Sequence, residues 1–181
     1  DPSLALRVKS MVALLRDSGE DLARLQQLHS RLVQMENAGD IVTDEKFEWF
    51  ELELDFNVAK GQNSGVMFRV ADKGGAIWHS GPEIQIYDDH GEPHAQKTGF
   101  LYELYDSKVD STKPAGQWNH FRIECRGDHF QTWLNGVACA DLHDSMTAKG
   151  FIGLQVHGVG DHEAPLRVRW KNIMLTDLAA K

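Results

Sequence analysis

Apolar and polar residues alternate along most of the chain after residue 39. The run from Phe50 to Val58 shows this most clearly, because each second residue is apolar and those between are acidic or amide. Side chains of a β-strand point alternately to its two faces, so this period of two predicts a half-buried strand. The same pattern predicts strands at 65–70, 83–88, 99–104, 119–126, 129–134, 137–142, 151–157 and 166–175.

Residues 119–142 are expected to form three consecutive antiparallel strands. Gly127-Asp128 and Asn135-Gly136 separate them, and Asn-Gly is the strongest short hairpin signal. Pairing across the first of these turns sets the register of the two strands beside it. It places Phe121, Ile123 and Cys125 opposite Leu134, Thr132 and Phe130.

The front of the chain has a different pattern. Pro2 and Ser3 suit a helix start, and apolar residues then recur at three- and four-residue spacings up to residue 28. This predicts a helical hairpin or two short helices, whereas residues 32–36 fit either a helix end or a first strand. We therefore expect an N-terminal helical segment at 1–30 and a β domain at 31–181.

The succession of short strands and turns predicts an all-β fold, a β-sandwich or jelly roll. The chain of 181 residues is long enough for one such domain with a substantial core. No helix longer than two turns is expected within 48–178. The register of the predicted strands separates Cys125 from Cys139 by roughly 12 Å, beyond the ~7 Å limit between Cα atoms of a disulfide, so we expect two free thiols.

Charge and hydropathy exclude several classes of partner. The formal net charge of −8 argues against nucleic acid and anionic membranes, because phosphate-binding domains concentrate Lys and Arg. No apolar run approaches the ~20 residues that span a bilayer. No signal peptide is visible in this chain. The predicted helices leave open an oligomer or a larger chain that docks through them.

One predicted strand has an unusual polar face. A carboxylate, an amide and a phenol share it, because Glu83, Gln85 and Tyr87 alternate with two isoleucines. A solvated strand is the simpler interpretation. Three further polar side chains occupy the non-core faces of their predicted strands, and one shared sheet would bring them to the same concavity. They are Arg69, Gln155 and His157.

This mixture of side chains suits a ligand with many hydroxyl groups. Arg, Glu and Gln supply fixed donors and acceptors, and Trp78 or Tyr102 could stack on a sugar ring. The sequence contains no Gly-rich phosphate loop, Cys-x-x-Cys pair, His-Glu-x-x-His or Gly-x-Ser-x-Gly. Among the nine histidines most fall in turns, where a solvated imidazole is the default, and metal ligation near residues 157–162 is left open.

Eight short stretches together carry a family resemblance. They are Gly39–Phe47, Asn63–Arg69, Trp78–Asp88, Thr98–Tyr102, Gly116–Asn119, Trp133–Gly136, Gly153–Gly158 and Asn172–Ile173. In order and spacing they resemble the 3-keto-disaccharide hydrolase domain, once catalogued as domain of unknown function 1080. The resemblance covers about three quarters of the chain, and residues 1–28 depart from it because the family usually opens with strands.

The resemblance implies a concanavalin-like jelly roll that acts on 3-keto-glycosides, with an oligosaccharide or glycoside as substrate. A ketone at C3 acidifies the hydrogen at C2, so a base can remove it and the C1 substituent can leave. His157 or Glu83 is the expected catalytic base, and a cofactor is not implied, although a divalent metal ion is left open. The expected substrate-binding residues are Arg69, Gln85, Gln155, Trp78, His79, Tyr102 and Asp88.

Two other functions remain open at this stage. Sandwiches of this kind often bind sugars without reacting with them, so a carbohydrate-binding, lectin-like module is the main alternative. An interaction domain that docks through its helices is a third. The resemblance also implies a periplasmic or secreted location in bacteria.

Overall fold

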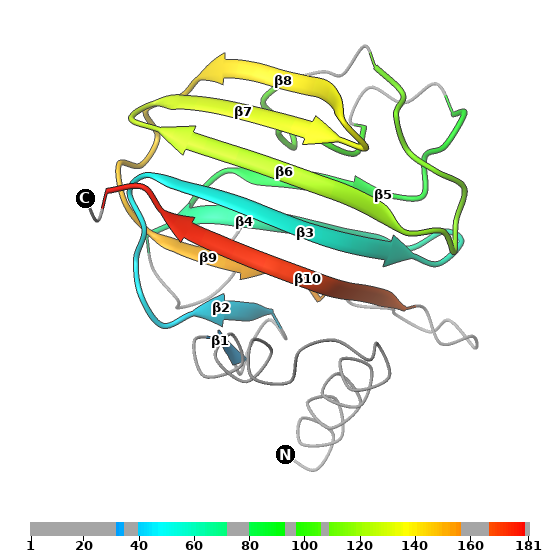
Figure 1. The fold of residues 1–181 in the computed structure, drawn as a ribbon, viewed down its shortest axis with the longest axis horizontal. Coiled ribbons are helices and arrows are strands. Elements are labelled where there is room, and N and C mark those ends of the chain that lie inside the picture. The colour runs from blue at the N-terminus through cyan, green and yellow to red at the C-terminus, as the bar shows by residue number, and fades with distance from the viewer. Residues whose placement is uncertain are drawn as a thin grey trace.

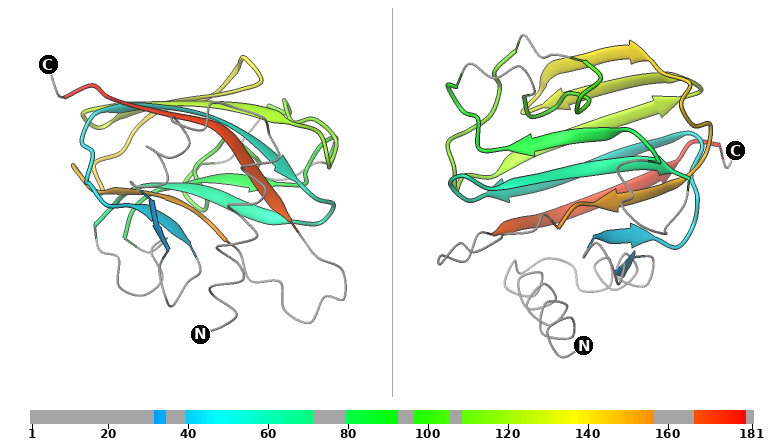
Figure 2. Two further views of the ribbon diagram at one scale, coloured as in Figure 1. Left: turned by 60° about the horizontal axis from the view of Figure 1, so that its bottom comes forward. Right: turned by 180° about the vertical axis from the view of Figure 1, so that it is seen from behind.

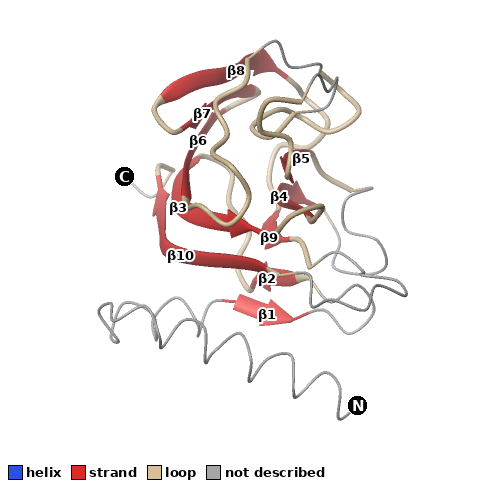
Figure 3. Cartoon of the chain, turned by 90° about the vertical axis from the view of Figure 1, so that its right-hand side faces the viewer, coloured by secondary structure: helices blue, strands red, loops and turns tan. Residues whose placement is uncertain are grey.

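The computed structural model describes residues 32–34, 40–71, 80–92, 97–105, 109–156 and 167–179, and only the backbone of the first of these ranges. Ten strands within them form two antiparallel sheets that face one another (Figures 1 and 3). The described residues contain no helix, as expected for 48–178. The helical segment expected at 1–30 lies outside the described residues, so the division of the chain at residue 30 stays a prediction.

Sheet I is the layer at the back of Figure 1 and is seen from its own side in the right panel of Figure 2. Its strand order is β1-β2-β9-β4-β5. The bounds are β1 (Leu32–Gln34), β2 (Ile41–Thr43), β9 (Phe151–Leu154), β4 (Asn63–Val70) and β5 (Glu83–Tyr87).

Sheet II is the layer at the front of Figure 1 and has the order β10-β3-β6-β7-β8. Its central strands β6 and β7 pair as the hairpin pattern predicted, with Cys125 opposite Phe130. Both cysteines are free in the structure. The bounds are β10 (Val168–Asp177), β3 (Phe50–Val58), β6 (Asn119–Arg126), β7 (His129–Leu134) and β8 (Val137–His143).

The core lies between the two sheets and is rich in phenylalanine. Phe68 of sheet I packs edge-on against two rings of sheet II, with centroids 6.0 Å from Phe50 and 5.0 Å from Phe130. All three rings are fully buried. Interdigitation of this kind gives a close-packed interior, so the predicted all-β sandwich is confirmed.

The largest differences between the predicted and the observed strands concern two segments. β9 ends at Leu154, three residues before the predicted end. The expected strand at 99–104 is wrong, because these residues form turns with one bridge between Ile84 and Leu101. The positive φ of Gly99 and Glu103 explains this, since an extended strand requires negative φ throughout.

Candidate functional site

A row of four residues crosses the outer face of sheet I, the face turned away from sheet II. Gly65 of β4 pairs with Gln85 of β5 on one side. On the other side its carbonyl accepts the Gln155 N–H at 2.9 Å. Asp40 ends the row, and its Oδ1 accepts the N–H of Val156 at 2.8 Å. The row therefore has one amide side chain on each side of a glycine, with a carboxylate at one end.

The Glu83 side chain lies across this row. Glu83 belongs to the same face of β5 as Gln85, but its side chain covers Gly65 of the next strand. A Cβ at position 65 would lie 2.7 Å from Glu83 Cδ and 2.8 Å from its Cγ, with Oε1 closer still. The carboxyl group therefore lies over β4, between the two amides of the row, and only 7% of the residue is exposed.

The environment of Glu83 alters its acidity. Burial raises the pKa of the Glu83 carboxyl to about 7, and the negative charges of Asp40 and Glu103 add to the effect. No residue in the described ranges donates a hydrogen bond to this carboxyl group. Near neutral pH both the protonated and the ionised form are populated, so the group can accept or donate a proton.

Three amides on this face have a buried oxygen without a hydrogen-bond partner. They are Asn63 Oδ1 on β4, Gln85 Oε1 on β5 and Gln155 Oε1 directly after β9. Leaving a buried polar atom unpaired costs about 1–3 kcal/mol, and native proteins contain few. Rotation of an amide exchanges its oxygen and nitrogen, so these positions suit hydroxyl groups, which both donate and accept.

Residues 97–105 run beside β5, at the edge of sheet I. The Gln85 N–H donates to the Phe100 carbonyl at 2.9 Å, and the Tyr102 N–H donates to the Glu83 carbonyl at 2.9 Å. Tyr102 thereby lies next to the buried acid. Partial burial raises the pKa of the Tyr102 phenol, and the charge of Glu103, a hydrogen bond to it and the charge of Glu83 raise it further.

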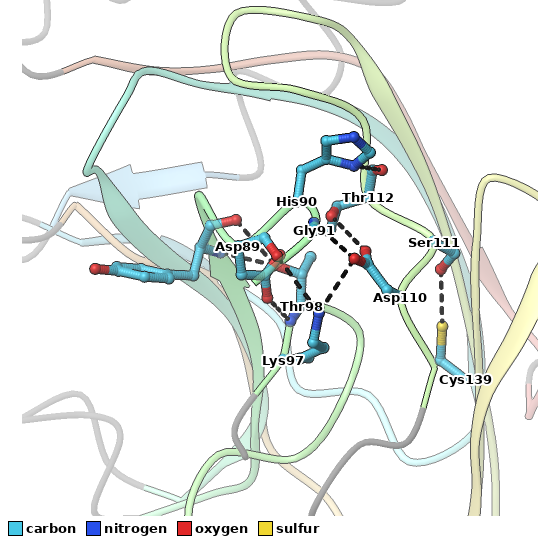
Figure 4. Close-up of polar contacts among 10 residues, drawn as sticks. Asp89, His90, Gly91, Lys97, Thr98, Asp110, Ser111, Thr112 and Cys139 are labelled. Carbon is cyan, nitrogen blue, oxygen red and sulfur yellow. Dashed lines mark hydrogen bonds and ion pairs between the residues drawn. The ribbon is translucent and has the colours of Figure 1, made fainter. Parts of the chain in front are cut away.

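A polar network holds residues 97–105 in place (Figure 4). Asp89 is fully buried, and its Oδ2 accepts the Thr98 N–H at 2.7 Å. The Lys97 ammonium donates to the Asp89 carbonyl and lies 3.3 Å from Asp110 Oδ2. Asp110 also accepts the Gly91 N–H at 2.7 Å. These contacts fix the loop after β5 to the segment that carries Tyr102.

The expectation that Arg69 shares the face of Glu83 is wrong. β4 pairs Met67 with Gly153 and Val70 with Phe151, so two residues of β4 stand between these pairs and only one residue of β9 does. The extra residue makes a β-bulge, in which Arg69 has a φ of 52°. The bulge shifts the alternation by one, which turns Val70 to the outer face and Arg69 inward.

Arg69 is only 1% exposed and binds backbone carbonyls. Its Nε and one Nη donate to the Glu48 carbonyl at 3.2 and 2.7 Å, and the other Nη donates to the Thr147 carbonyl at 2.9 Å. It also donates to the Gly127 carbonyl and stacks over the Phe130 ring, with 5.0 Å between Cζ and the centroid. Arg69 thus ties three loops together at one end of the sandwich, with its side chain turned away from the outer face of sheet I.

The other predicted site residues have three different outcomes. Gln85, Gln155 and Glu83 gather around Gly65, and Tyr102 lies beside Glu83 on the far side of β5. Asp88 lies five residues beyond Glu83, about 17 Å along an extended strand, and its carboxylate accepts the Gly61 N–H at 2.9 Å. The remaining three, Trp78, His79 and His157, lie outside the described residues.

Three residues of the site were missed from the sequence: Asp40, Asn63 and Gly65. Each lies within one of the eight quoted motifs, which was the available signal. Asn63 and Gly65 occupy alternate positions of β4, on the same face as Glu83. Asp40 precedes a strand of three residues, too short for alternation to reveal its orientation.

Neither a metal site nor a membrane span is found in the described ranges. There, no three His, Cys, Asp or Glu residues are arranged to hold an ion. The same ranges contain no helix long and apolar enough to cross a bilayer.

The chain is similar to several known proteins. A family model described as the 3-keto-alpha-glucoside-1,2-lyase-like domain matches residues 24–176. A "3-keto-disaccharide hydrolase" of Bacteroides thetaiotaomicron is 32% identical over an alignment 104 residues long, and the match covers 48% of this chain and 36% of that relative. The chain therefore spans about a third of the relative's length.

Solved structures show the same fold. A candidate glycosyl hydrolase from Parabacteroides distasonis is 31% identical, with a TM-score of 0.66 over 77% of this chain and 83% of that one. A carbohydrate-binding module, CBM66, from Bacillus subtilis is 17% identical, with a TM-score of 0.54 over 77% and 82%. At that identity the second likeness shows the fold alone.

Proposed function

Because the chain belongs to the 3-keto-alpha-glucoside-1,2-lyase-like domain family, we propose that it cleaves 3-keto-glycosides, with Glu83 as the group that moves the proton. Membership supports a carbohydrate-active function, and the geometry of the outer face of sheet I supports the finer assignment. The single observation that carries it is the Glu83 carboxyl, buried between unpaired amides with a pKa of about 7.

The proposed reaction is an elimination followed by hydration. A ketone at C3 stabilises negative charge at C2, so Glu83 in its ionised form removes the C2 proton. The electron pair of the broken C2–H bond first delocalises onto the C3 oxygen as an enolate. It then forms the C1=C2 double bond as the C1–O bond breaks, and the aglycone oxygen keeps the electron pair of that bond and takes up a proton. Addition of water returns a proton to C2 and places a hydroxyl on C1, so the net result is hydrolysis.

The neighbours of Glu83 have distinct proposed roles. Asp40 holds a negative charge near Glu83 and so favours its protonated form after proton abstraction. Gln85 and Gln155 would bind sugar hydroxyls through the buried ends of their amides. Gln155, with its amide rotated, can also donate to the enolate oxygen that forms at C3. Tyr102, in the segment 97–105 beside β5, would border the sugar.

His157, Trp78 and His79 remain proposed members of the site on the sequence pattern alone. His157 is the alternative base, and the other two would contact the sugar at its rim. We further propose a periplasmic or secreted location, as the family resemblance implies. A divalent metal ion remains a proposal of the same standing.

A carbohydrate-binding module is the second candidate function. The unpaired amides favour it as much as they favour the enzyme, because they call for hydroxyl groups without requiring a reaction. Only the buried acid distinguishes the two, since binding alone does not need a carboxyl group that titrates near neutral pH.

Incubation with a 3-keto-glucoside that carries a chromogenic aglycone tests the proposal. Release of the aglycone, with the unsaturated ketone or its hydrate as co-product, supports the enzyme. Saturable binding without release supports the binding module. Neither release nor binding, for this compound and for the corresponding unoxidised glucoside, would contradict both functions.

A further inference from the structure

We infer that Gly65 is a positioning residue, because the missing side chain at this place lets the Glu83 carboxyl lie across β4 between Gln85 and Gln155. The inference deepens the proposed function and rests on it for its consequence in catalysis. Its structural part, which concerns where the Glu83 side chain lies, stands by itself.

The backbone gives no reason for a glycine at position 65. Six described glycines, all in turns or loops, have positive φ, which other residues adopt only with strain. Gly65 is not one of these and lies in the regular ladder of β4, between Ser64 and Val66. Glycine within a strand weakens it, since it adds no packing and is flexible when unfolded. Its presence therefore calls for another explanation.

The space above Gly65 supplies that explanation. The three nearest atoms to a Cβ placed there all belong to the Glu83 side chain. Gly150 differs, because its Cβ would meet the backbone of Arg69 and Val70. An alanine at 150 must displace main chain, whereas an alanine at 65 need only displace a rotatable side chain. Gly65 is thus tied to the position of one carboxyl group.

Displacement of Glu83 has two chemical consequences. The carboxyl would leave the line between the two amides, where the sugar hydroxyls are proposed to bind. It would also become less buried and move relative to Asp40, the two causes that raise its pKa most. A methyl group at 65 is therefore expected to impair proton transfer while leaving the sheet intact.

Gly65→Ala, assayed on the 3-keto-glucoside, is the first experiment. We expect kcat to fall on the order of 10²-fold with a smaller change in KM, and the lower inflection of the kcat/KM pH profile to move from about 7 toward 4.5. A merely structural glycine would lower activity in proportion to the folded fraction and leave the inflection in place. That second result would overturn the inference.

A double-mutant cycle tests the contact itself. Gly65→Ala should lower the unfolding midpoint in the wild-type background and leave it equal or higher in the Glu83→Ala background, where nothing fills the space. Gly150→Ala should lower the midpoint equally in both backgrounds, and it serves as the matched control. Equal losses from Gly65→Ala in the two backgrounds would contradict the inference.

A titration separates this inference from the proposed function. The carboxyl carbon of Glu83, observed by NMR in ¹³C-labelled wild type and Gly65→Ala protein, reports its pKa without any turnover. A lower value in the variant supports positioning by Gly65 even if the wild type releases no aglycone, in which case only the proposed function fails. Identical values in the two proteins would overturn the inference even if the wild type is active.

Discussion

The outer faces of the two sheets share an alternating sequence pattern but provide opposite environments. On sheet II the polar side chains pair with one another: Arg122 donates to Glu51 at 3.0 Å through Nε, and His120 lies 2.8 Å from Asp55. On sheet I the buried amide oxygens of Gln85 and Gln155 have no such partner among the described residues.

This difference separates a surface whose charges pair with one another from one that we propose binds a ligand. Paired and half-exposed charges are satisfied by each other and by water, and each pair contributes little to stability. Unpaired buried polar atoms cost stability, which a bound ligand with matching hydroxyls would recover.

The strongest test of this contrast is the pair Glu83→Gln and Glu51→Gln. Loss of the proposed acid–base group should lower kcat/KM on the order of 10²–10⁴-fold, because glutamine cannot transfer the proton. Glu51 is the matched control on sheet II, and its substitution should change activity by about twofold or less. Rates of aglycone release from the 3-keto-glucoside measure both. Equal losses in the two variants would remove the functional difference between the faces.

A second comparison sets the buried Arg69 against the half-exposed Arg122. Arg69→Met leaves three carbonyl acceptors of the buried cation without donors, so the free energy of unfolding should fall by about 3 kcal/mol or more. Arg122→Met, on the outer face of sheet II, should cost about 1 kcal/mol or less. Urea unfolding followed by tryptophan fluorescence gives both values. A small loss at Arg69 would contradict its role as a clamp.

The pH dependence of stability isolates the environment of Glu83. Its carboxyl titrates at about 7 in the folded protein against an ordinary value of 4.5 in the unfolded chain, so between these values the folded protein retains a proton that the unfolded chain has lost. The stabilising effect is complete below about 4.5 and disappears as pH rises to 7. Relative to Glu83→Gln, the wild type should lose up to about 3 kcal/mol over this range. Parallel curves for the two proteins would contradict the raised pKa.

The smallest expected effects come from the unpaired amides. Gln85→Leu or Gln155→Leu removes a buried atom without a partner, so stability should stay the same or rise by about 1 kcal/mol. Binding of the glycoside should weaken about tenfold, the value of one hydrogen bond. Gln131→Leu on β7, whose amide donates to Asp141, should leave binding unchanged. Calorimetry of binding checks all three, and unchanged affinity for both site variants would argue against hydroxyl recognition there.

Most of the sandwich was predictable from alternation because strand formation depends on near neighbours. β3 has the predicted bounds, and the β6–β7 register follows from the turn at 127–128. The segment at 99–104 was predicted incorrectly, since alternation cannot report the positive φ of Gly99 and Glu103. Its backbone nevertheless bonds to β5, so it borders the site without being a strand.

The candidate site was only partly predictable. Glu83 and Gln85 were predicted because they share one face of β5. Gln155 was predicted from the alternation of residues 151–157, although β9 itself ends at Leu154. Arg69 did not, because a bulge depends on the partner strand and one inserted residue reverses every later side chain. Asp40 and Gly65 were missed because a single carboxylate and a single glycine have no pattern of their own.

The sequence alone determined most of the strands and most of their apolar faces, since both depend largely on the local order of side chains. The tertiary structure decided which polar groups are paired. Strand order brings Gln85, Gly65, Gln155 and Asp40 into one row although 115 positions separate its last two members along the chain. Burial of Glu83 over that row raises its pKa to about 7, because desolvation and neighbouring charge are properties of the folded environment and not of the residue.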